Sequence, residues 1–343
     1  MNFNIQEADL SKDQNLIIET LRKYLTPQSD LKRFQWLYCN NPYGKARVWF
    51  IFDSRNFIAI GLCAAFPRSV WVESNESLGW VLGDFCLNSQ YRSLGPALAL
   101  QRACLKGLEQ ESNTFFYDFP SNVMMAIYRR MGIKAFGEFV RLAKPLRIDR
   151  KVQQFFGKGL FSKVLSHGGN LILKTKNSKA KALEAVTFDF HCSDFNEEFT
   201  EFDKDTSRPS RCSLQRSANY LNWRYSVNPF YTFEVLTARV NKVLQGYVIF
   251  TRADGEGTIF DIRCISDDKL ISALINQVTN FLREEEIITI NFPILKSHPW
   301  LTLFEGLGFI VREKIPVVMG SYPNDELLND MGSWFLLHGD RDS

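Results

Sequence analysis

The stretch that decides the fold is VLGDFCLNSQYRSLGPALALQRACL, residues 81–105. Its pattern predicts a strand, a short turn that carries a glycine, and a long helix whose apolar residues recur at helical spacing. Arg92, Gly95 and Ala97 have the spacing R-x-x-G-x-A, and Pro96 suits the first position of a helix because its φ is fixed and it lacks an N–H. Backbone N–H groups from Arg92 to Ala97 would face outward at the positive end of the helix, so the stretch predicts a phosphate cradle, although a plain turn would also use Gly and Pro.

Length and composition indicate a large globular protein. With 343 residues the chain is about twice a typical domain, so we expect two domains, and its 45% hydrophobic and 14% aromatic residues can form sizeable cores. No apolar run approaches membrane-spanning length, and the polar, acidic start is unlike a signal peptide, which favours the cytoplasm. The seven cysteines form no C-x-x-C pair and the four histidines no constellation, so we expect reduced thiols and no metal site.

The charge is uneven along the chain, although the net charge is only +3. Eleven basic residues and a single acid, Asp149, lie between Arg141 and Ala182. Within this segment, residues 151–167 place apolar side chains at helical spacing with lysines between them, which is typical of a basic amphipathic helix. Such a helix can bind an anionic membrane or dock on a neighbouring domain, and both interpretations stay open. No nucleic-acid motif accompanies it, so we expect no nucleic-acid partner.

The N-terminal part of the chain predicts a mixed α/β domain that ends near Leu146. We expect it to begin with a helix and a connector over residues 5–30. The elements expected after it are strands at 48–54, 57–67, 69–72 and 79–87, a helix at 97–109, a strand at 114–120, a helix at 122–131 and a strand at 135–146.

The second part of the chain repeats the first. LNWRYSVNP, residues 221–229, matches FQWLYCNNP, residues 34–42, at a constant offset, which pairs Trp36 with Trp223, Tyr38 with Tyr225, Asn41 with Asn228 and Pro42 with Pro229. Because these residues occur in both copies, we expect them to have a structural role and not a catalytic one. Two copies of one fold in tandem explain the pattern.

One feature is not repeated. Where the first copy has the cradle, the second has ISDDKLIS, residues 265–272, with no glycine and with Asp267 and Asp268 at the turn. Two carboxylates there would repel a phosphate, so we expect the second copy not to bind one.

This chain resembles the GNAT superfamily of acyl-CoA-dependent N-acyltransferases. Arg92, Gly95 and Ala97 meet the signature [QR]-x-x-G-x-[GA] of that superfamily, between a strand and a helix as the family requires. The resemblance implies an α/β (α+β) fold of two tandem GNAT-like domains, each a mixed, mostly antiparallel sheet flanked by helices, as in mycothiol synthase and N-myristoyltransferase. The expected parts are a cofactor-binding domain at 1–147, a basic linker at 148–184 and a degenerate domain at 185–343.

A second family feature is an Asn followed by Ala and Tyr ahead of a Gly-aromatic end. Asn122, Ala126, Tyr128 and Gly132 correspond to it, with Ala and Tyr shifted by about one place and Ile133 in place of the usual Phe. The resemblance implies that acyl-CoA lies between the strands at 81–87 and 114–119. The residues implied to hold it are Cys86, Leu87, Arg92, Ser93, Leu94, Gly95, Pro96, Ala97 and Asn122.

The resemblance also implies direct acyl transfer, from acetyl-CoA or a related acyl-CoA, to a small-molecule amine acceptor in the cleft between the copies. Tyr128 is the expected acid for the departing thiolate, although it could be a core aromatic, and Asp84 is the expected base, although it could be the partner of an arginine. For Asn122, which follows Pro120 and Ser121 at the start of a helix, the position favours an N-cap role over contact with the ligand. An amino sugar of cell-surface polysaccharide biosynthesis is the acceptor that family association suggests. Two alternatives stay open, an aminoacyl transferase of the FemAB type and a non-catalytic acyl-CoA sensor or scaffold.

Overall fold

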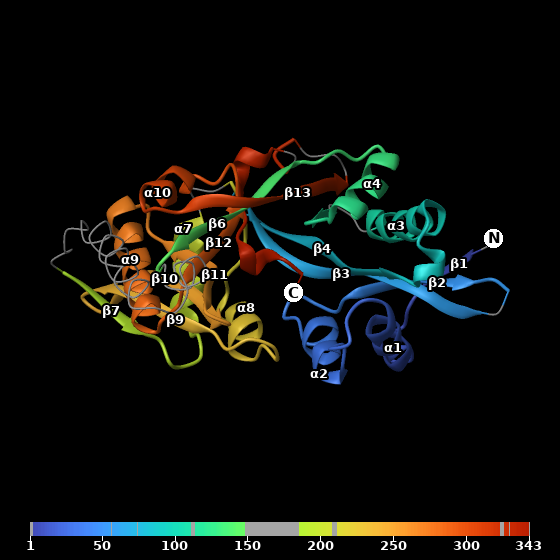
Figure 1. The fold of residues 1–343 in the computed structure, drawn as a ribbon, viewed down its shortest axis with the longest axis horizontal. Helices are drawn as coiled ribbons and strands as arrows, with labels where there is room; N and C mark the ends of the chain where they lie inside the picture. Colours follow the sequence, from blue (N-terminus) through green and yellow to red (C-terminus); the bar gives the residue numbers. More distant parts are fainter. Residues whose placement is uncertain are drawn as a thin grey trace, which may run out of the picture.

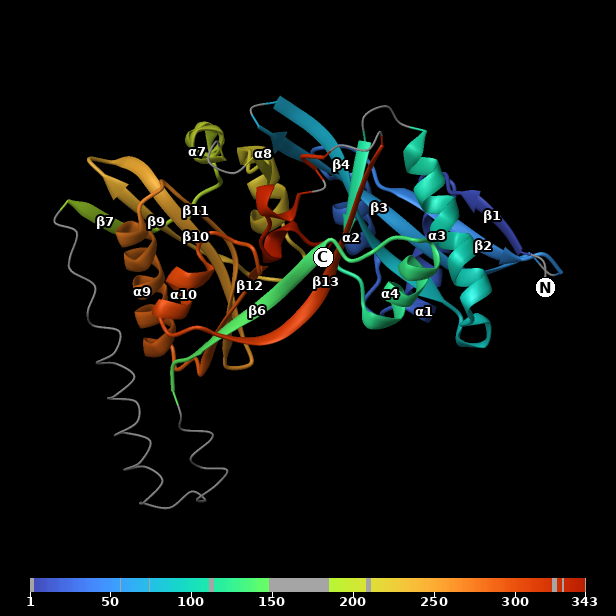
Figure 2. The same cartoon turned by 90° about the horizontal axis from the view of Figure 1, so that it is seen from above.

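The computed structural model describes residues 3–55, 57–73, 75–110, 114–147, 185–207, 211–322, 326–328 and 330–342. We call residues 3–147 the N-terminal half and residues 185–342 the C-terminal half. The described strands form one continuous, mostly antiparallel sheet that runs through both halves, with helices packed on its faces (Figures 1 and 2). The mixed α/β fold predicted from the sequence is confirmed. The basic segment at 148–184 lies outside the described residues.

The N-terminal half contains the strand order β1-β2-β3-β4-β5. Its strands are β1 (Phe3–Glu7), β2 (Arg47–Asp53), β3 (Ile58–Val72), β4 (Asn75–Leu87) and β5 (Thr114–Asp118). Helices α1 (Gln14–Tyr24) and α2 (Leu31–Phe34) lie on one face, and α3 (Leu94–Glu109) and α4 (Asn122–Arg130) lie on the other (Figure 1). The short turns are the π-helical η1 (Gln35–Cys39) and the 3-10 turn η2 (Ser89–Tyr91).

Two sequence expectations for this half are wrong. Residues 5–30 do not begin with a helix, because residues 3–7 form the edge strand β1, which pairs with β2. Residues 69–72 are not a separate strand either. They are the end of β3, which continues through Pro67 because the ladder to β4 extends unbroken on both sides of that residue.

The C-terminal half has the order β7-β9-β10-β11-β12. Its strands are β7 (Val186–Phe190), β8 (Cys212–Leu214), β9 (Glu234–Val240), β10 (Val243–Ala253), β11 (Glu256–Cys264), β12 (Thr289–Leu295) and β14 (Trp334–Phe335). Its helices and turns are α7 (Glu197–Ser207), α8 (Ala218–Leu221), η3 (Asn222–Ser226), α9 (Asp268–Glu284), α10 (Leu301–Gly306), η4 (Met331–Ser333) and η5 (His338–Asp340). In both halves the ladder between the fourth and fifth strands of this order is parallel, at β4–β5 and at β11–β12.

Two long strands join the halves. Strand β13 (Ile310–Tyr322) comes from the C-terminal half but lies between β5 and β6 (Gly137–Pro145), and β6 in turn lies between β13 and β12. Each half therefore supplies a strand to the sheet of the other. Figure 2 shows β6 and β13 crossing the middle of the molecule, where the C-terminus also lies.

The repeated tryptophans lie at the contact between the halves. The Trp36 and Trp223 rings stack with their centroids 5.3 Å apart. The indole N–H of each donates to the backbone carbonyl of the other, and both bonds measure 2.8 Å. Buried indole N–H groups need such acceptors, so the repeated sequence encodes a symmetrical clamp between the halves. These residues have the structural role that the sequence predicts.

Three buried apolar clusters account for most of the core. One lies under α3 and α4, a second lies under α9 and α10, and the largest extends from α1 and α2 across the tryptophan clamp into the C-terminal half. None of the described helices is both long enough and apolar enough to span a bilayer.

Candidate active site

A cavity of 860 Å³ opens where β4 and β5 separate. The parallel pairing of these strands ends at Val81 and Tyr117, whereas β4 stays paired with β3 as far as Leu87. The stretch of β4 after Val81 therefore has an edge that β5 does not cover. Strand β4, the start of α3, the start of α4, the end of β5 and the C-terminal residues Arg341 and Asp342 line this cavity. Its volume lies in the range typical of small-molecule sites.

The predicted cradle forms one end of the cavity. Helix α3 begins at Leu94, so it starts before Ala97 and Pro96 is its third residue, not its first. Ser93 is the N-cap residue and makes no side-chain capping bond, so among the described residues no side chain occupies the N-terminal amides of α3. A Cβ added at Gly95 would meet nothing within 4 Å. The cradle is therefore exposed and uncapped, as an anion site at a helix N-terminus requires.

In the C-terminal half, the N-terminus of the corresponding helix, α9, is capped. Asp267 caps α9, and its carboxylate accepts hydrogen bonds from the backbone N–H of Lys269 at 2.8 Å and of Leu270 at 3.4 Å. The pocket next to this turn, at the C-terminal end of β11, measures only 180 Å³, and aromatic residues Trp300 and Phe335 line it. Asp267 thus occupies the N–H groups that a phosphate would need.

Six of the nine residues predicted to hold the cofactor line the cavity: Cys86, Leu87, Arg92, Ser93, Leu94 and Ala97. Arg92 is exposed, and its Nε donates to the carbonyl of Leu87 at 3.1 Å, which fixes the stem of the side chain beside β4. Gly95 and Pro96 belong to the same turn of α3 but are not part of the lining. Asn122 is not in the lining and is not the N-cap of α4. Ser121 has that role, and its Oγ accepts from the N–H of Met124 at 3.3 Å.

The structure does not place Asp84 as the predicted base. Asp84 lies in a bulge of β4 with a positive φ of 48°, and it is not among the residues that line the cavity. Both of its carboxylate oxygens accept from the buried guanidinium of Arg33 at 2.6 Å, and Tyr38 also donates to it. A carboxylate held in this way has a structural ion-pair role, which was the alternative interpretation of this residue.

Tyr128 is likewise not in direct contact with the cavity. Its ring is fully buried, its hydroxyl donates to Asp118 at 2.7 Å, and Gln101 donates to that hydroxyl at 3.2 Å. Burial, and then the neighbouring Asp118, raise the pKa of Tyr128 well above its usual value. The phenol therefore stays protonated and orients the carboxyl of Asp118, which does line the cavity.

Asp118 and Asp342 are the acidic residues that the sequence analysis missed. The pKa of Asp118 is raised to about 7: burial raises it most, the hydrogen bond from Tyr128 lowers it, and the nearby Asp342 raises it. Burial and then Asp84 raise the pKa of Asp342, whereas Arg341 lowers it. Two interacting carboxyl groups with raised pKa values in one cavity are suited to acid–base chemistry, since one can hold a proton while the other is ionised.

Close packing fixes Asp342 in this position. A Cβ at Gly83 would lie 2.7 Å from the Cβ of Asp342, so only glycine allows the C-terminal segment to approach β4 here. The segment is also held by its backbone, because the carbonyl of Arg341 accepts from Arg68 at 3.3 Å and from Arg224 at 3.2 Å. In the sequence, an aspartate inside the apolar run TFFYDFP was the signal for Asp118, whereas no local signal marked Asp342.

Comparison of the fold with solved structures gives consistent matches across nearly the whole chain. A GCN5-related N-acetyltransferase from Anabaena variabilis aligns with a TM-score of 0.67 and 14% identity, over 93% of this chain and 72% of its own. A conserved protein of unknown function from Enterococcus faecalis aligns with a TM-score of 0.70 and 12% identity, over 94% of this chain and 73% of its own.

The fold is also similar to that of N-myristoyltransferase from Saccharomyces cerevisiae, solved with bound myristoyl-CoA. This match has a TM-score of 0.58 and 11% identity, over 92% of this chain and 82% of that one. No family model matches the sequence, and no curated protein matches it. The likeness therefore lies in the three-dimensional arrangement and not in the sequence. The chain has the fold of the GCN5-related N-acetyltransferase superfamily.

Proposed function

We propose that this protein is an acyl-CoA-dependent N-acyltransferase that uses the 860 Å³ cavity of the N-terminal half. The observation that carries the proposal is the contrast between two equivalent helices. The N-terminus of α3 is uncapped and opens into a large cavity, whereas Asp267 caps the N-terminus of α9 beside a small one. Only the first can accept the pyrophosphate of a nucleotide-linked thioester.

The residues present fit an acyl-CoA. The N–H groups of Leu94 and Gly95 and the side chain of Arg92 would hold the phosphates. The uncovered edge of β4 near Cys86 and Leu87 offers backbone groups to the amides of the pantetheine arm. The thioester supplies an activated acyl group.

The chain's own carboxyl groups supply the proton transfers in this proposal. Asp342, as a carboxylate, accepts the proton that the amine loses when its nitrogen forms the new bond to the acyl carbon. Asp118, as a carboxylic acid held by the Tyr128 hydroxyl, donates a proton to the departing thiolate. Asp118 replaces Tyr128 as the acid because it lines the cavity, and Tyr128 becomes a positioning residue. Asp342 replaces Asp84 because Arg33 occupies both oxygens of Asp84.

The finer parts of the proposal rest on resemblance. We propose acetyl-CoA as the donor, and the amino sugar suggested by family association as the acceptor. We also propose a division into two GNAT-like units, with a cofactor unit at 1–147 and a degenerate unit at 185–343, in the cytoplasm. The uncapped cradle argues against the FemAB alternative, because a transferase that takes its acyl group from aminoacyl-tRNA predicts a poor phosphate turn here.

A turnover assay distinguishes an acyltransferase from a non-catalytic acyl-CoA sensor. The protein is incubated with acetyl-CoA and a panel of primary amines, and acceptor-dependent release of CoA is followed by chromatography. We expect release by the wild type and a loss of about 100-fold or more in Asp342→Asn, with unchanged affinity for acetyl-CoA. If the protein binds acetyl-CoA but no amine causes release of CoA, the protein is a non-catalytic sensor and not an acyltransferase.

A further inference from the structure

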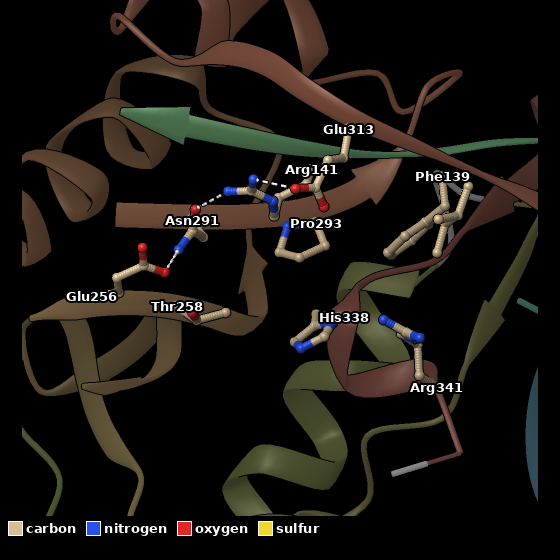
Figure 3. Close-up of a pocket in the computed structure, with 10 residues that line it drawn as sticks. Phe139, Arg141, Glu256, Thr258, Asn291, Pro293, Glu313, His338 and Arg341 are labelled. Carbon is tan, nitrogen blue, oxygen red and sulfur yellow. Dashed lines mark hydrogen bonds and ion pairs between the residues drawn. The ribbon is translucent and has the colours of Figure 1, made fainter. Parts of the chain in front are cut away.

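A second cavity, of 490 Å³, adjoins the first one. Its floor consists of four neighbouring strands, β11, β12, β6 and β13, and the C-terminal segment lies across it (Figure 3). Arg341 lines both cavities. The two spaces therefore meet at this residue, next to the carboxyl group of Asp342.

The floor carries a chain of polar side chains on one face of the sheet. Asn291 is buried and uses both ends of its amide: its nitrogen donates to Glu256 at 2.9 Å, and its oxygen accepts from Arg141 at 2.6 Å. Arg141 also donates to Glu313 at 2.6 Å. Figure 3 shows these four residues in a row that faces the pocket. Internal bonds fix the row, so it offers a preformed set of acceptors from the remaining carboxylate oxygens.

The opposite wall carries polar groups that have no partner within the described part of the chain. His338 has a buried Nδ1 without a hydrogen-bond partner there, and the same holds for the Nε of Arg341. Burial, Arg341 and Arg224 lower the pKa of His338 to about 3, so the imidazole is neutral and can donate from one nitrogen and accept at the other. The guanidinium of Arg341 stands 5.6 Å from the ring of Phe119 at the mouth of the first cavity.

The positive and negative charges of the side chains that line this pocket cancel. Glu256 and Glu313 are opposed by Arg141 and Arg341, and His338 is neutral. A pocket without net charge, which has both donors and acceptors along its walls, suits a ligand whose groups can both donate and accept. Hydroxyl groups do so, and the ring of Phe139 at one end offers an apolar surface to carbon atoms.

We infer that this polar pocket is the binding site of the acceptor, and that the acceptor is an amine that carries several hydroxyl groups. The hydroxyl groups bond to Glu256, Thr258, Glu313 and His338, and the amine extends past Arg341 toward Asp342. The inference rests on the proposed function for the identity of the reaction, but it can be tested through binding alone. It assigns to the C-terminal half a specific task, which is to hold the acceptor.

The test uses glucosamine as a hydroxylated amine and cyclohexylamine as a ring amine without hydroxyl groups. Their dissociation constants are measured by ligand-detected NMR with wild type, with the pocket variant Glu256→Gln/Thr258→Val, and with the control Glu305→Gln/Thr302→Val. The control makes the same changes at exposed positions on α10. We expect glucosamine to bind the wild type and the control equally, to bind the pocket variant about tenfold more weakly, and to outcompete cyclohexylamine.

Several results would overturn the inference: no glucosamine binding to the wild type, equal binding to the pocket variant, or cyclohexylamine binding as tight as that of glucosamine. Calorimetry with acetyl-CoA on the same three proteins tests the proposed function separately from the acceptor site. If acetyl-CoA fails to bind while glucosamine behaves as expected, the pocket assignment stands and the acyltransferase proposal falls. If acetyl-CoA binds all three equally while glucosamine binding fails, only the acceptor site is wrong.

Discussion

Replacing Asp118 with asparagine should change how stability depends on pH. The folded pKa of Asp118 is about 7, whereas an unfolded aspartate titrates near 3.9. The folded state therefore binds this proton more tightly, and the stabilisation is fully present below the unfolded pKa and is lost as the pH rises through 7. Integrating between these pKa values gives about 2.5 kcal/mol at pH 5 and nearly none at pH 8.

Asparagine keeps an oxygen that can accept from Tyr128 but cannot titrate. Urea unfolding of the wild type and Asp118→Asn, followed by circular dichroism at pH 5 and pH 8, gives the difference between the two pH dependences. We expect the wild type to gain about 2 to 3 kcal/mol of unfolding free energy relative to the variant as the pH falls from 8 to 5. The control is Asp254→Asn, in the exposed turn between β10 and β11.

Parallel pH dependences of wild type and Asp118→Asn, within about 0.5 kcal/mol, would refute the raised pKa and with it the acid role. The rate should depend on pH in the same direction as the stability. If Asp118 must be protonated to act, kcat/KM falls as the pH rises through about 7, and this limb disappears in the asparagine variant together with about 100-fold or more of the rate.

The remaining predictions concern three positions. Tyr128→Phe removes a hydrogen bond that lowers the pKa of Asp118. We therefore expect the alkaline limb of the pH–rate profile to shift to higher pH, with the affinity for acetyl-CoA unchanged in calorimetry. Gly83→Ala forces Asp342 away from β4, so kcat should fall about tenfold or more, and a variant that keeps its full rate would show that Asp342 is not the base. Trp223→Phe leaves the Trp36 carbonyl without its donor, so urea unfolding should show a loss of about 2 kcal/mol, and an unchanged midpoint would contradict the clamp.

The parts of the fold that local pattern determines were predictable. The strand, turn and helix around Arg92 and Gly95 depend on residues that are close in the chain, and the periodicity of the helix and the glycine turn identify them. The repeated Trp36 and Trp223 were equally visible, because a matched spacing needs no structure to detect. The edge strand β1 was missed because five residues of mixed exposure give a weak alternating signal.

The parts of the site that depend on distant contacts were not predictable. Asp84 lies on the expected strand, but its role depends on Arg33, which the fold brings to it from another element. Asp342 reaches the cavity only because the C-terminal segment passes between the halves and Gly83 leaves room for it. The exchange of β6 and β13 also escaped prediction, since an apolar strand pattern does not say which sheet the strand joins.

The central claim is that acyl-CoA binds at the uncapped start of α3. Isothermal calorimetry with acetyl-CoA on the wild type, Gly95→Asp and Gly306→Asp tests it most directly, because a Cβ at either glycine would meet nothing within 4 Å. We expect binding to the wild type and to Gly306→Asp, and a loss of about tenfold or more in Gly95→Asp, whose carboxylate would stand beside the phosphates. Absence of binding to the wild type, or equal binding to all three proteins, would contradict the claim.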